Sequence, residues 1–417
     1  MSKFVFDSRQ VEDGDIFVAI KGERNNGHDF VNEAFKKGAV KAIVEEERDY
    51  NGEVLLVDNV IDFLNREASK ILVDNSKIRI GITGSNGKTT TKNFLAHLLA
   101  YGFKVFKTEK NYNTEIGIPL SILNNYSGEP VSIVEMGLRK EDDIGFLTRL
   151  YKPNVSILLN IGTAHLQFFE KREKIASEKL KIVFEMEKPG IVFVNGDEEL
   201  LNIDYPEDVK VFRFGENENN DGVLIDFDYL NGNTRVFYNI YNEDVMRTLQ
   251  GIWSKGQLID ALAALLVSLY FEIPLDPFYI FSFKLPEKRF ELKEYNGKIV
   301  INDAYNASKE SFFSAFESIE KMDVDRKVLI MGRVLEITDE VEYHMEIINE
   351  AKKVFDKIYF YDPEEFFDFE GIEYLRNSDD VLNVLNAESG LIYVKASNGT
   401  GLGAIVEKIL NEKNNKQ

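Results

Sequence analysis

The strongest chemical signal in the chain is the glycine-rich run Thr83-Gly84-Ser85-Asn86-Gly87-Lys88-Thr89-Thr90-Thr91. Glycines let the backbone curl so that successive N–H groups face one anion, and the start of a following helix adds its dipole. In such a loop Lys88 would place its charge on the β- and γ-phosphates of a nucleotide, and the Thr89 hydroxyl would ligate Mg²⁺. The general motif has a glycine five residues before Gly87, where this chain has Ile82, and Gly84 stands three residues before it. An ordinary glycine-rich turn is the alternative, but Gly-Lys-Thr in this context favours a nucleotide site.

Two further polar residues follow apolar runs in the same way. Glu135 ends the run 131–134, and His165 follows the run that ends at residues 159–162. Ligands collect at the carboxyl ends of strands in open α/β sheets, and a carboxylate there suits Mg²⁺. On these grounds alone, a histidine such as His165 is more often a hydrogen-bonded structural residue than a ligand, and Lys179 is a solvated helix residue.

The elements that must position these residues alternate between strand and helix. Short apolar runs at 77–83, 131–134, 155–159 and 191–194 are separated by helix-length segments. This alternation predicts βαβ units and a mostly parallel sheet. Asn231-Gly232, flanked by alternating residues over 223–241, predicts a hairpin. The Ala- and Leu-rich stretch 254–270 predicts a buried helix.

Three blocks divide the chain, in line with about 150 residues per domain for 417 residues. We expect domains at 1–75, 76–285 and 286–417. The first has short strand-like runs at 15–20, 42–44 and 54–57 and a helical stretch near 30–37. In the third, runs at 299–301, 328–331, 358–361 and 391–394 alternate with helical segments, which predicts a second α/β domain.

Composition excludes several classes of protein. The chain has 50 Lys+Arg against 71 Asp+Glu, a formal net charge of −21, which disfavours nucleic acid and anionic membrane surfaces as partners. There is no cysteine, so disulfides, iron–sulfur clusters and thiolate zinc sites are excluded. We see no secretory signal and no 18-residue apolar stretch, so we expect a cytoplasmic protein without membrane insertion.

Several motifs, in order along the chain, resemble the Mur ligase family of peptidoglycan synthesis. Tyr305-Asn306-Ala307 and the opening Asp7-Ser8-Arg9 resemble its MurF branch. The other matching segments are the phosphate loop, Val134-Glu135-Met136-Gly137, Asn160-Ile161-Gly162-Thr163-Ala164-His165-Leu166, Leu285-Pro286-Glu287-Lys288-Arg289-Phe290-Glu291, Asn302-Asp303-Ala304, and Gly14-Asp15 with Gly27-His28-Asp29-Phe30.

This resemblance implies a three-domain α/β architecture. A central P-loop-type, mostly parallel sheet would be flanked by a small α/β N-terminal domain that binds the UDP substrate. A Rossmann-like C-terminal domain would bind the acceptor and complete the ATP site. The implied activity is an ATP-dependent ligase, acting as a monomer, that joins D-alanyl-D-alanine to UDP-N-acetylmuramoyl-tripeptide through an acyl phosphate.

The resemblance also implies roles for individual residues. Lys88 would hold the phosphates, Thr89 and Glu135 the first Mg²⁺, and His165 the second. Lys179 falls where the family carries a lysine carbamylated by CO₂, an anion that can support the second metal. The remaining implied contacts are Arg289, Asp303, Gln257 and the loop residues Gly84, Ser85, Asn86, Gly87 and Thr90 with ATP, Asn113 near the reacting carboxylate, and Ser8 and Arg9 with the uridine nucleotide.

The chain departs from the family pattern at a few positions. Thr114 replaces the second Asn of an Asn-Asn pair, and the adenine-side amides become Gln257 and Asp260. Gln257 offers the same amide on a longer arm, whereas Asp260 cannot donate. The third block has Gly332-Arg333-Val334 for Gly-Asp-Met and Lys395-Ala396-Ser397-Asn398 for Lys-Gly-Ser-Arg.

Alternative functions stay open at this point. For Ser8 and Arg9, a strand-end turn is nearly as good an interpretation as a nucleotide contact. A related ligase with another acceptor, such as a MurE-type enzyme, would share most motifs. A P-loop protein that binds ATP and joins nothing is less favoured, because it has no use for His165, Lys179 and Arg289 together.

Overall fold

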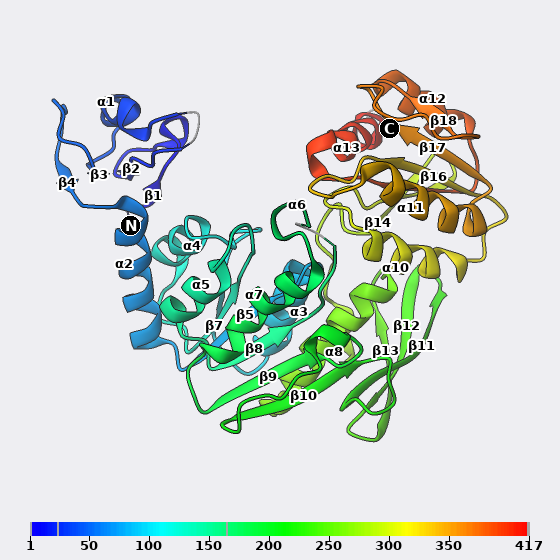
Figure 1. The fold of residues 1–417 in the computed structure, drawn as a ribbon, viewed down its shortest axis with the longest axis horizontal. Helices are drawn as coiled ribbons and strands as arrows, with labels where there is room; N and C mark the ends of the chain where they lie inside the picture. Colours follow the sequence, from blue (N-terminus) through cyan, green and yellow to red (C-terminus); the bar gives the residue numbers. More distant parts are fainter. Residues whose placement is uncertain (1, 23–24, 164–165, 415–417) are drawn as a thin grey trace.

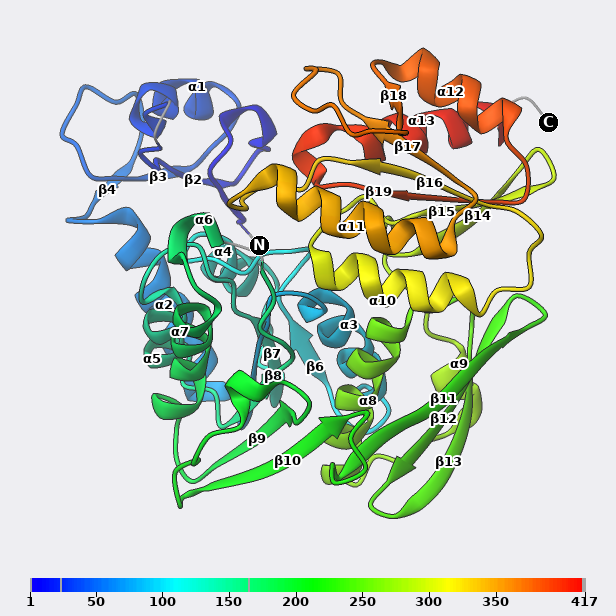
Figure 2. The ribbon, with the colours of Figure 1, turned by 45° about the vertical axis from the view of Figure 1, so that its right-hand side comes forward.

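The computed structural model describes residues 2–22, 25–163 and 166–414. It contains three sheets with four, nine and six strands, each associated with helices (Figure 1). Figures 1 and 2 place the N-terminal and C-terminal sheets on the same side of the central unit. The predicted α/β class and three-part architecture are confirmed.

The first sheet is small and parallel, in the order β1-β2-β3-β4. Phe17, Ala42 and Val44 pack with Ala34 of helix α1 on one face. Its elements are β1 (Phe4–Val5), η1 (Ser8–Gln10), β2 (Ile16–Val18), η2 (Gly27–Phe30), α1 (Val31–Lys36), β3 (Lys41–Val44) and β4 (Val54–Leu56).

Helix α2 (Val60–Asn75) belongs to two cores. Leu64, near its start, packs with Val18 of the first sheet. Further along, Leu72 lies in the core of the central unit, and Asn65 accepts a hydrogen bond from the Tyr151 hydroxyl at 2.9 Å. The helix ties the two units together, and the domain boundaries remain a prediction.

The central sheet is parallel over seven strands, in the order β11-β10-β9-β8-β5-β7-β6. Helices α3 and α8 cover one face, and α2, α4, α5 and α7 cover the other. Its elements begin with β5 (Ile78–Thr83), α3 (Lys88–Leu99), β6 (Val105–Lys107), α4 (Gly117–Asn125), β7 (Val131–Glu135), α5 (Asp143–Tyr151), β8 (Val155–Leu158), α6 (Leu166–Phe169), α7 (Arg172–Phe184), β9 (Gly190–Asn195), η3 (Glu199–Leu201) and β10 (Val209–Gly215).

The remainder of the central unit includes the predicted hairpin and the predicted buried helix. Strands β11 (Gly222–Leu230) and β12 (Asn233–Ile240) flank a turn in which Asn231 has φ +52° and Gly232 φ +73°, and β13 (Glu243–Leu249) extends the sheet antiparallel. Two positive φ angles favour Asn-Gly in a two-residue hairpin turn. Helix α8 (Lys255–Tyr270) begins with a capping box between Ser254 and Gln257 and is buried over most of its length; α9 (Pro277–Phe281) follows it.

The third sheet has the order β14-β15-β19-β16-β17-β18 and is parallel except for its β14–β15 pair. Helices α10 and α11 pack on one face, and α12 and α13 on the other. Its elements are β14 (Glu291–Tyr295), β15 (Lys298–Asn302), α10 (Lys309–Glu320), β16 (Lys327–Gly332), α11 (Glu340–Val354), β17 (Lys357–Tyr361), β18 (Glu373–Leu375), α12 (Ser378–Ala387), β19 (Leu391–Lys395), η4 (Asn398–Thr400) and α13 (Leu402–Asn414).

Within the described ranges, no helix combines the length and the apolar character that are needed to cross a bilayer.

Candidate active site

The phosphate loop joins β5 to α3 between the neighbouring strands β8 and β7. Gly87, just before α3, has φ +84°, and a Cβ there would lie 2.1 Å from Oδ1 of Asp260. Both the backbone angle and the space therefore require glycine.

Asn160, which follows β8, fixes the first half of this loop. Its Oδ1 accepts the N–H of Asn86 at 2.8 Å, and its carbonyl accepts the N–H of Ser85 at 3.0 Å. The N–H groups of residues 87–90 donate to no other described residue, because the first turn of a helix leaves its donors without partners. Donors without partners at a helix N-terminus make an anion site. Here the site consists of the amides of residues 87–90, because the amides of Ser85 and Asn86 already bind Asn160.

Lys88 curls back over the loop. Its Nζ donates to the carbonyls of Gly84 at 2.6 Å and Ser85 at 3.1 Å. Burial lowers the pKa of Lys88, and the nearby Glu135 carboxylate opposes that shift. An anion on the neighbouring amides would offer this ammonium a stronger acceptor than the carbonyls do.

Glu135 ends β7 and is 2% exposed. Its Oε2 accepts a hydrogen bond from Thr89 Oγ1 at 2.9 Å and lies 3.0 Å from Nζ of Lys92, and its Oε1 accepts one from Asn113 Nδ2 at 3.0 Å. Burial alone would raise the pKa of Glu135, but the ammonium groups of Lys92 and Lys88 outweigh it and hold the pKa below its ordinary value. The structure thus brings Thr89, Glu135 and Asn113 together around an anionic carboxylate.

Lys179 lies on α7 and is 2% exposed, so it is not the solvated helix residue of the alternative interpretation. Burial and the Lys88 ammonium both lower the pKa of Lys179. His165, its predicted neighbour at the metal, lies outside the described residues, so its place stays a prediction.

The donor set beside the loop fits Mg²⁺. The Thr89 hydroxyl and the Glu135 carboxylate are oxygen donors within 2.9 Å of each other. Over the described ranges, no group of three or more His, Asp or Glu side chains could by itself hold a metal. Mg²⁺ is commonly held by one or two carboxylates together with substrate phosphates. One hydroxyl and one carboxylate beside an anion site therefore suit a Mg²⁺ ion that is bound mainly by a nucleotide.

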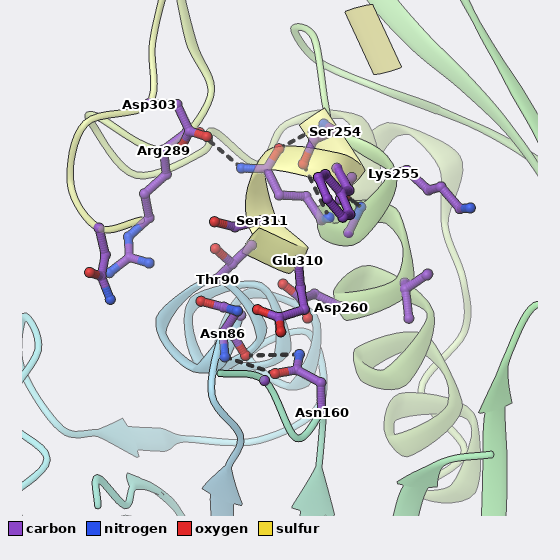
Figure 3. A pocket seen from close by; sticks show the side chains of 18 of the residues that line it. Asn86, Thr90, Asn160, Ser254, Lys255, Asp260, Arg289, Asp303, Glu310 and Ser311 are labelled. Atoms are coloured by element: carbon purple, nitrogen blue, oxygen red, sulfur yellow. Dashed lines mark hydrogen bonds between the residues drawn. The ribbon is translucent and has the colours of Figure 1, made fainter. Parts of the chain in front are cut away.

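Two cavities meet at the phosphate loop. The first, of about 460 Å³, lies between the loop, the start of α8 and the C-terminal unit (Figure 3). The second, of about 560 Å³, lies on the side of Glu135 and Asn113. Asn86, Gly87 and Arg289 line both. A nucleotide on the loop would have room for its base and ribose on one side and a chamber for a second reactant on the other.

Arg289 comes from the C-terminal side of the site. Its guanidinium lies 4.1 Å from the centre of the Tyr305 ring, and its carbonyl accepts a hydrogen bond from Gln257 Nε2 at 2.8 Å. Gln257 Oε1 accepts the N–H of Ser254 at 2.8 Å. The Gln257 amide is therefore occupied at both ends, and it links α8 to the segment that carries Arg289.

Asp303 lines the first cavity, but both of its oxygens are already engaged. Oδ1 accepts the N–H of Phe290 at 3.0 Å, and Oδ2 accepts hydrogen bonds from Tyr393 at 2.8 Å and Lys395 at 2.6 Å. Asp303 therefore holds the backbone next to Arg289 in place.

Hydrogen bonds also hold the central and C-terminal units together across the site. Asn86 Nδ2 donates to Ser308 Oγ at 2.9 Å, and the N–H and hydroxyl of Thr163 both donate to Glu310 at 3.1 Å. The hydroxyls of Thr163 and Tyr343 are 2.6 Å apart. Sequence analysis missed Glu310 and Tyr343, since their partner is 147 and 180 residues away and no local pattern announces such a contact.

Ser8 and Arg9 lie apart from these residues, in η1 of the first unit, and line neither cavity. Arg9 pairs with Asp7 at 2.7 Å, with 83% of its side chain exposed. The Ser8 carbonyl accepts a hydrogen bond from Lys37 Nζ at 3.1 Å. The structure therefore does not bring this pair together with the phosphate loop.

Known proteins share both the sequence and the fold. The family model described as "Mur ligase middle domain" matches residues 82–267, and the one described as "Mur ligase family, catalytic domain" matches residues 4–78. The UDP-N-acetylmuramoyl-tripeptide–D-alanyl-D-alanine ligase of Bacillus subtilis is 32% identical over 97% of this chain and 92% of its own. The crystal structure of MurF ligase from Thermotoga maritima in complex with ADP has 33% identity and a TM-score of 0.91, covering 100% of this chain and 99% of that one. MurF from Acinetobacter baumannii, at 22% identity, shares the fold with a TM-score of 0.86 over 98% and 93% of the two chains.

Proposed function

The chain belongs to the Mur ligase family, in its MurF branch, and we propose on that premise that it uses ATP to join D-alanyl-D-alanine to UDP-N-acetylmuramoyl-tripeptide. The observation that carries this proposal is the set of amides at residues 87–90, which donate to no other described residue and lie between two cavities and beside Lys88 and Glu135. An anion site shared by two chambers suits the transfer of a phosphoryl group from one reactant to another.

ATP would occupy the first cavity with its phosphates on the loop. The amides of residues 87–90 and the Lys88 ammonium would hold the β- and γ-phosphates, with Arg289 adding charge from the C-terminal unit. Gly84, Ser85, Asn86 and Thr90 would shape the loop. We assign Gln257 and Asp303 to ATP binding as positioning residues, because their polar groups fix the segment of Arg289.

Thr89 and Glu135 would hold one Mg²⁺, which when bound would neutralise charge on the phosphates. We also propose His165 and a carbamylated Lys179 for a second Mg²⁺. Burial lowers the pKa of Lys179 and so favours its neutral amine, which adds to CO₂ and releases one proton, leaving an anionic carbamate. The neighbouring Lys88 ammonium favours that anion, whereas it opposes a second buried ammonium.

The reaction itself activates a poor electrophile. A carboxylate oxygen of the tripeptide attacks the γ-phosphorus as the bond to ADP breaks, giving an acyl phosphate. The amine of D-alanyl-D-alanine then attacks the acyl carbon, phosphate leaves, and the nitrogen loses a proton. Asn113, in the second cavity, would position the reacting carboxylate, and Lys88 and Arg289 would stabilise the charge that gathers on the phosphoryl oxygens.

Other expectations extend this proposal. We propose that Ser8 and Arg9 bind the uridine nucleotide from the first unit, and that the enzyme works as a monomer in the cytoplasm. We expect no nucleic-acid partner, because the net charge of −21 repels a phosphate backbone.

The test is phosphate release with UDP-N-acetylmuramoyl-tripeptide and a panel of acceptors. We expect almost no ATP turnover until the tripeptide and D-alanyl-D-alanine are both present. Faster turnover with a single amino acid such as diaminopimelate would point to a MurE-type ligase. ATP turnover that ignores both co-substrates would favour a nucleotide-binding protein that joins nothing.

A further inference from the structure

Asp260 places a carboxyl group inside the first cavity. It lies on α8 and is 6% exposed. Its oxygens lie against the phosphate loop, where they fill the space that a side chain on Gly87 would need. Figure 3 shows Asp260 near the loop residues Asn86 and Thr90.

This carboxylate has no partner in the described part of the chain: no hydrogen bond or ion pair engages it there. Lys88 of α3 and Arg289 of the C-terminal unit face it, and the Tyr238 hydroxyl of β12 lies within range of its charge. Glu310 of α10 also lines the cavity. Burial is the largest influence, and although Arg289 and Lys88 oppose it, the pKa of Asp260 rises to about 7.

Glu135, on the other side of the same loop, shows the opposite behaviour. It is even less exposed than Asp260, but three side chains donate to it or pair with it, and its pKa falls. The difference lies in the partners and not in the depth of burial. Among the described residues, Asp260 lacks the hydrogen-bond donors that would keep a carboxylate charged.

A bound nucleotide would make the charged form of Asp260 still less favourable. Its phosphates would lie on the amides of residues 87–90, next to this carboxyl group, and like charges at close range in a water-poor site repel strongly. Lys88 and Arg289 would turn toward the phosphates, and their charges would then no longer counter the rise in the pKa of Asp260 that burial causes. A neutral carboxyl group can in addition donate its O–H to the nucleotide and accept with its carbonyl oxygen, as a side-chain amide does.

We infer that Asp260 contacts the bound nucleotide as a neutral carboxylic acid, and that binding of ATP or ADP takes up one proton from solvent at this side chain. The inference rests on the proposed function in one respect, the presence of a nucleotide in the first cavity. Asp260 would then be a nucleotide-binding residue, and the affinity of the protein for the nucleotide would fall as pH rises.

Titration calorimetry of ADP binding to the whole protein tests this directly. With Mg²⁺ present throughout, the measurement is made at pH 8 in buffers of different ionisation enthalpy, which yields the number of protons taken up. We expect close to one for the wild-type protein and close to none for Asp260→Asn, which has the same shape. The ratio of the wild-type to the Asp260→Asn dissociation constant should rise about tenfold between pH 6 and pH 8. Asp228→Asn, on the exposed hairpin, should behave as the wild-type protein does.

The outcomes separate this inference from the proposed function. ADP binding by the wild-type protein without proton uptake would overturn the inference alone, and that result does not depend on whether the variant folds. Equal uptake by Asp260→Asn would place the proton elsewhere and also overturn it. Absence of ADP binding by the wild-type protein would overturn the proposed nucleotide site and the inference with it.

Discussion

Nζ of Lys92 lies 3.0 Å from Oε2 of Glu135, and the two side chains are 0% and 2% exposed. The same ammonium donates to the carbonyl of Lys110 at 2.6 Å. Lys92 therefore connects helix α3, strand β7 and the segment that leads to Asn113. Burial lowers the pKa of Lys92, and Glu135 opposes the shift, so each charge depends on the other.

Removal of one partner of this pair should cost more than removal of both. Lys92→Met leaves a buried carboxylate uncompensated, and we expect the free energy of unfolding to fall by about 3 kcal/mol or more. Lys92→Met with Glu135→Gln should recover part of that loss. Urea unfolding of the two variants measures it, and a single-variant loss below about 1 kcal/mol would show that the pair is not coupled in this way.

Lys88→Ala should lower ADP formation by about 100-fold or more, because it removes a charge that the phosphates need in the transition state. The melting temperature should stay within a few degrees of the wild-type value, since the lost contacts are two hydrogen bonds to loop carbonyls and not core packing. Lys174→Ala, an exposed lysine paired with Glu170, is the matched control. Near-normal turnover by Lys88→Ala would refute the proposed phosphate role.

Lys179→Ala should lose activity that short carboxylic acids partly restore. The added acid would supply the anion that the carbamate provides in the wild-type protein. Carbamylation itself can be checked by carbon NMR on protein equilibrated with labelled bicarbonate. Full activity of the variant without added acid would be incompatible with a carbamate at this position.

Arg289→Ala should reduce turnover without unfolding the central unit. Its guanidinium stacks on Tyr305 and lines both cavities, so the loss should fall on ATP use and not on a core. Arg235→Ala, which breaks an exposed pair with Asp228, serves as control. A large fall in melting temperature with unchanged turnover would indicate a structural residue instead.

The raised pKa of Asp260 also predicts a pH dependence of stability. The folded protein keeps this proton up to about pH 7, while the unfolded chain releases it near pH 3.8. The contribution of Asp260 to the free energy of unfolding is therefore complete below pH 3.8 and is lost as pH rises to 7. Over that range the wild-type protein should lose up to about 4 kcal/mol relative to Asp260→Asn. Urea unfolding of both proteins from pH 4 to pH 8 measures the difference, and a flat difference would mean that the group titrates normally.

Sequence patterns predicted the elements that carry the loop. The runs at 77–83, 131–134 and 155–159 form β5, β7 and β8, and their order in the sheet places Glu135 next to the phosphate loop. Such runs are visible because buried parallel strands are apolar along their whole length. Strands β1, β6, β10, β13, β14 and β18 were not predicted, because their mixed or short sequences lack that continuous signal.

The site was predictable only where one segment carries the chemistry. The loop and Glu135 follow from local motifs, whereas the engagement of Gln257 and Asp303 in contacts within the protein depends on how two units meet. Lys92 lies four residues after Lys88, so the two share one face of helix α3. This spacing could have indicated a second lysine near Glu135, but we did not predict one. The burial of Asp260 against Gly87 joins residues 173 positions apart, and composition gives no sign of it.

The most direct test of the account follows an oxygen atom. The tripeptide's terminal carboxylate is labelled with oxygen-18, and the phosphate released during ligation to D-alanyl-D-alanine is examined by mass spectrometry. Activation of the acid by ATP predicts that each phosphate carries one labelled oxygen from that carboxylate. Phosphate without label, released at the rate of ligation, would contradict it.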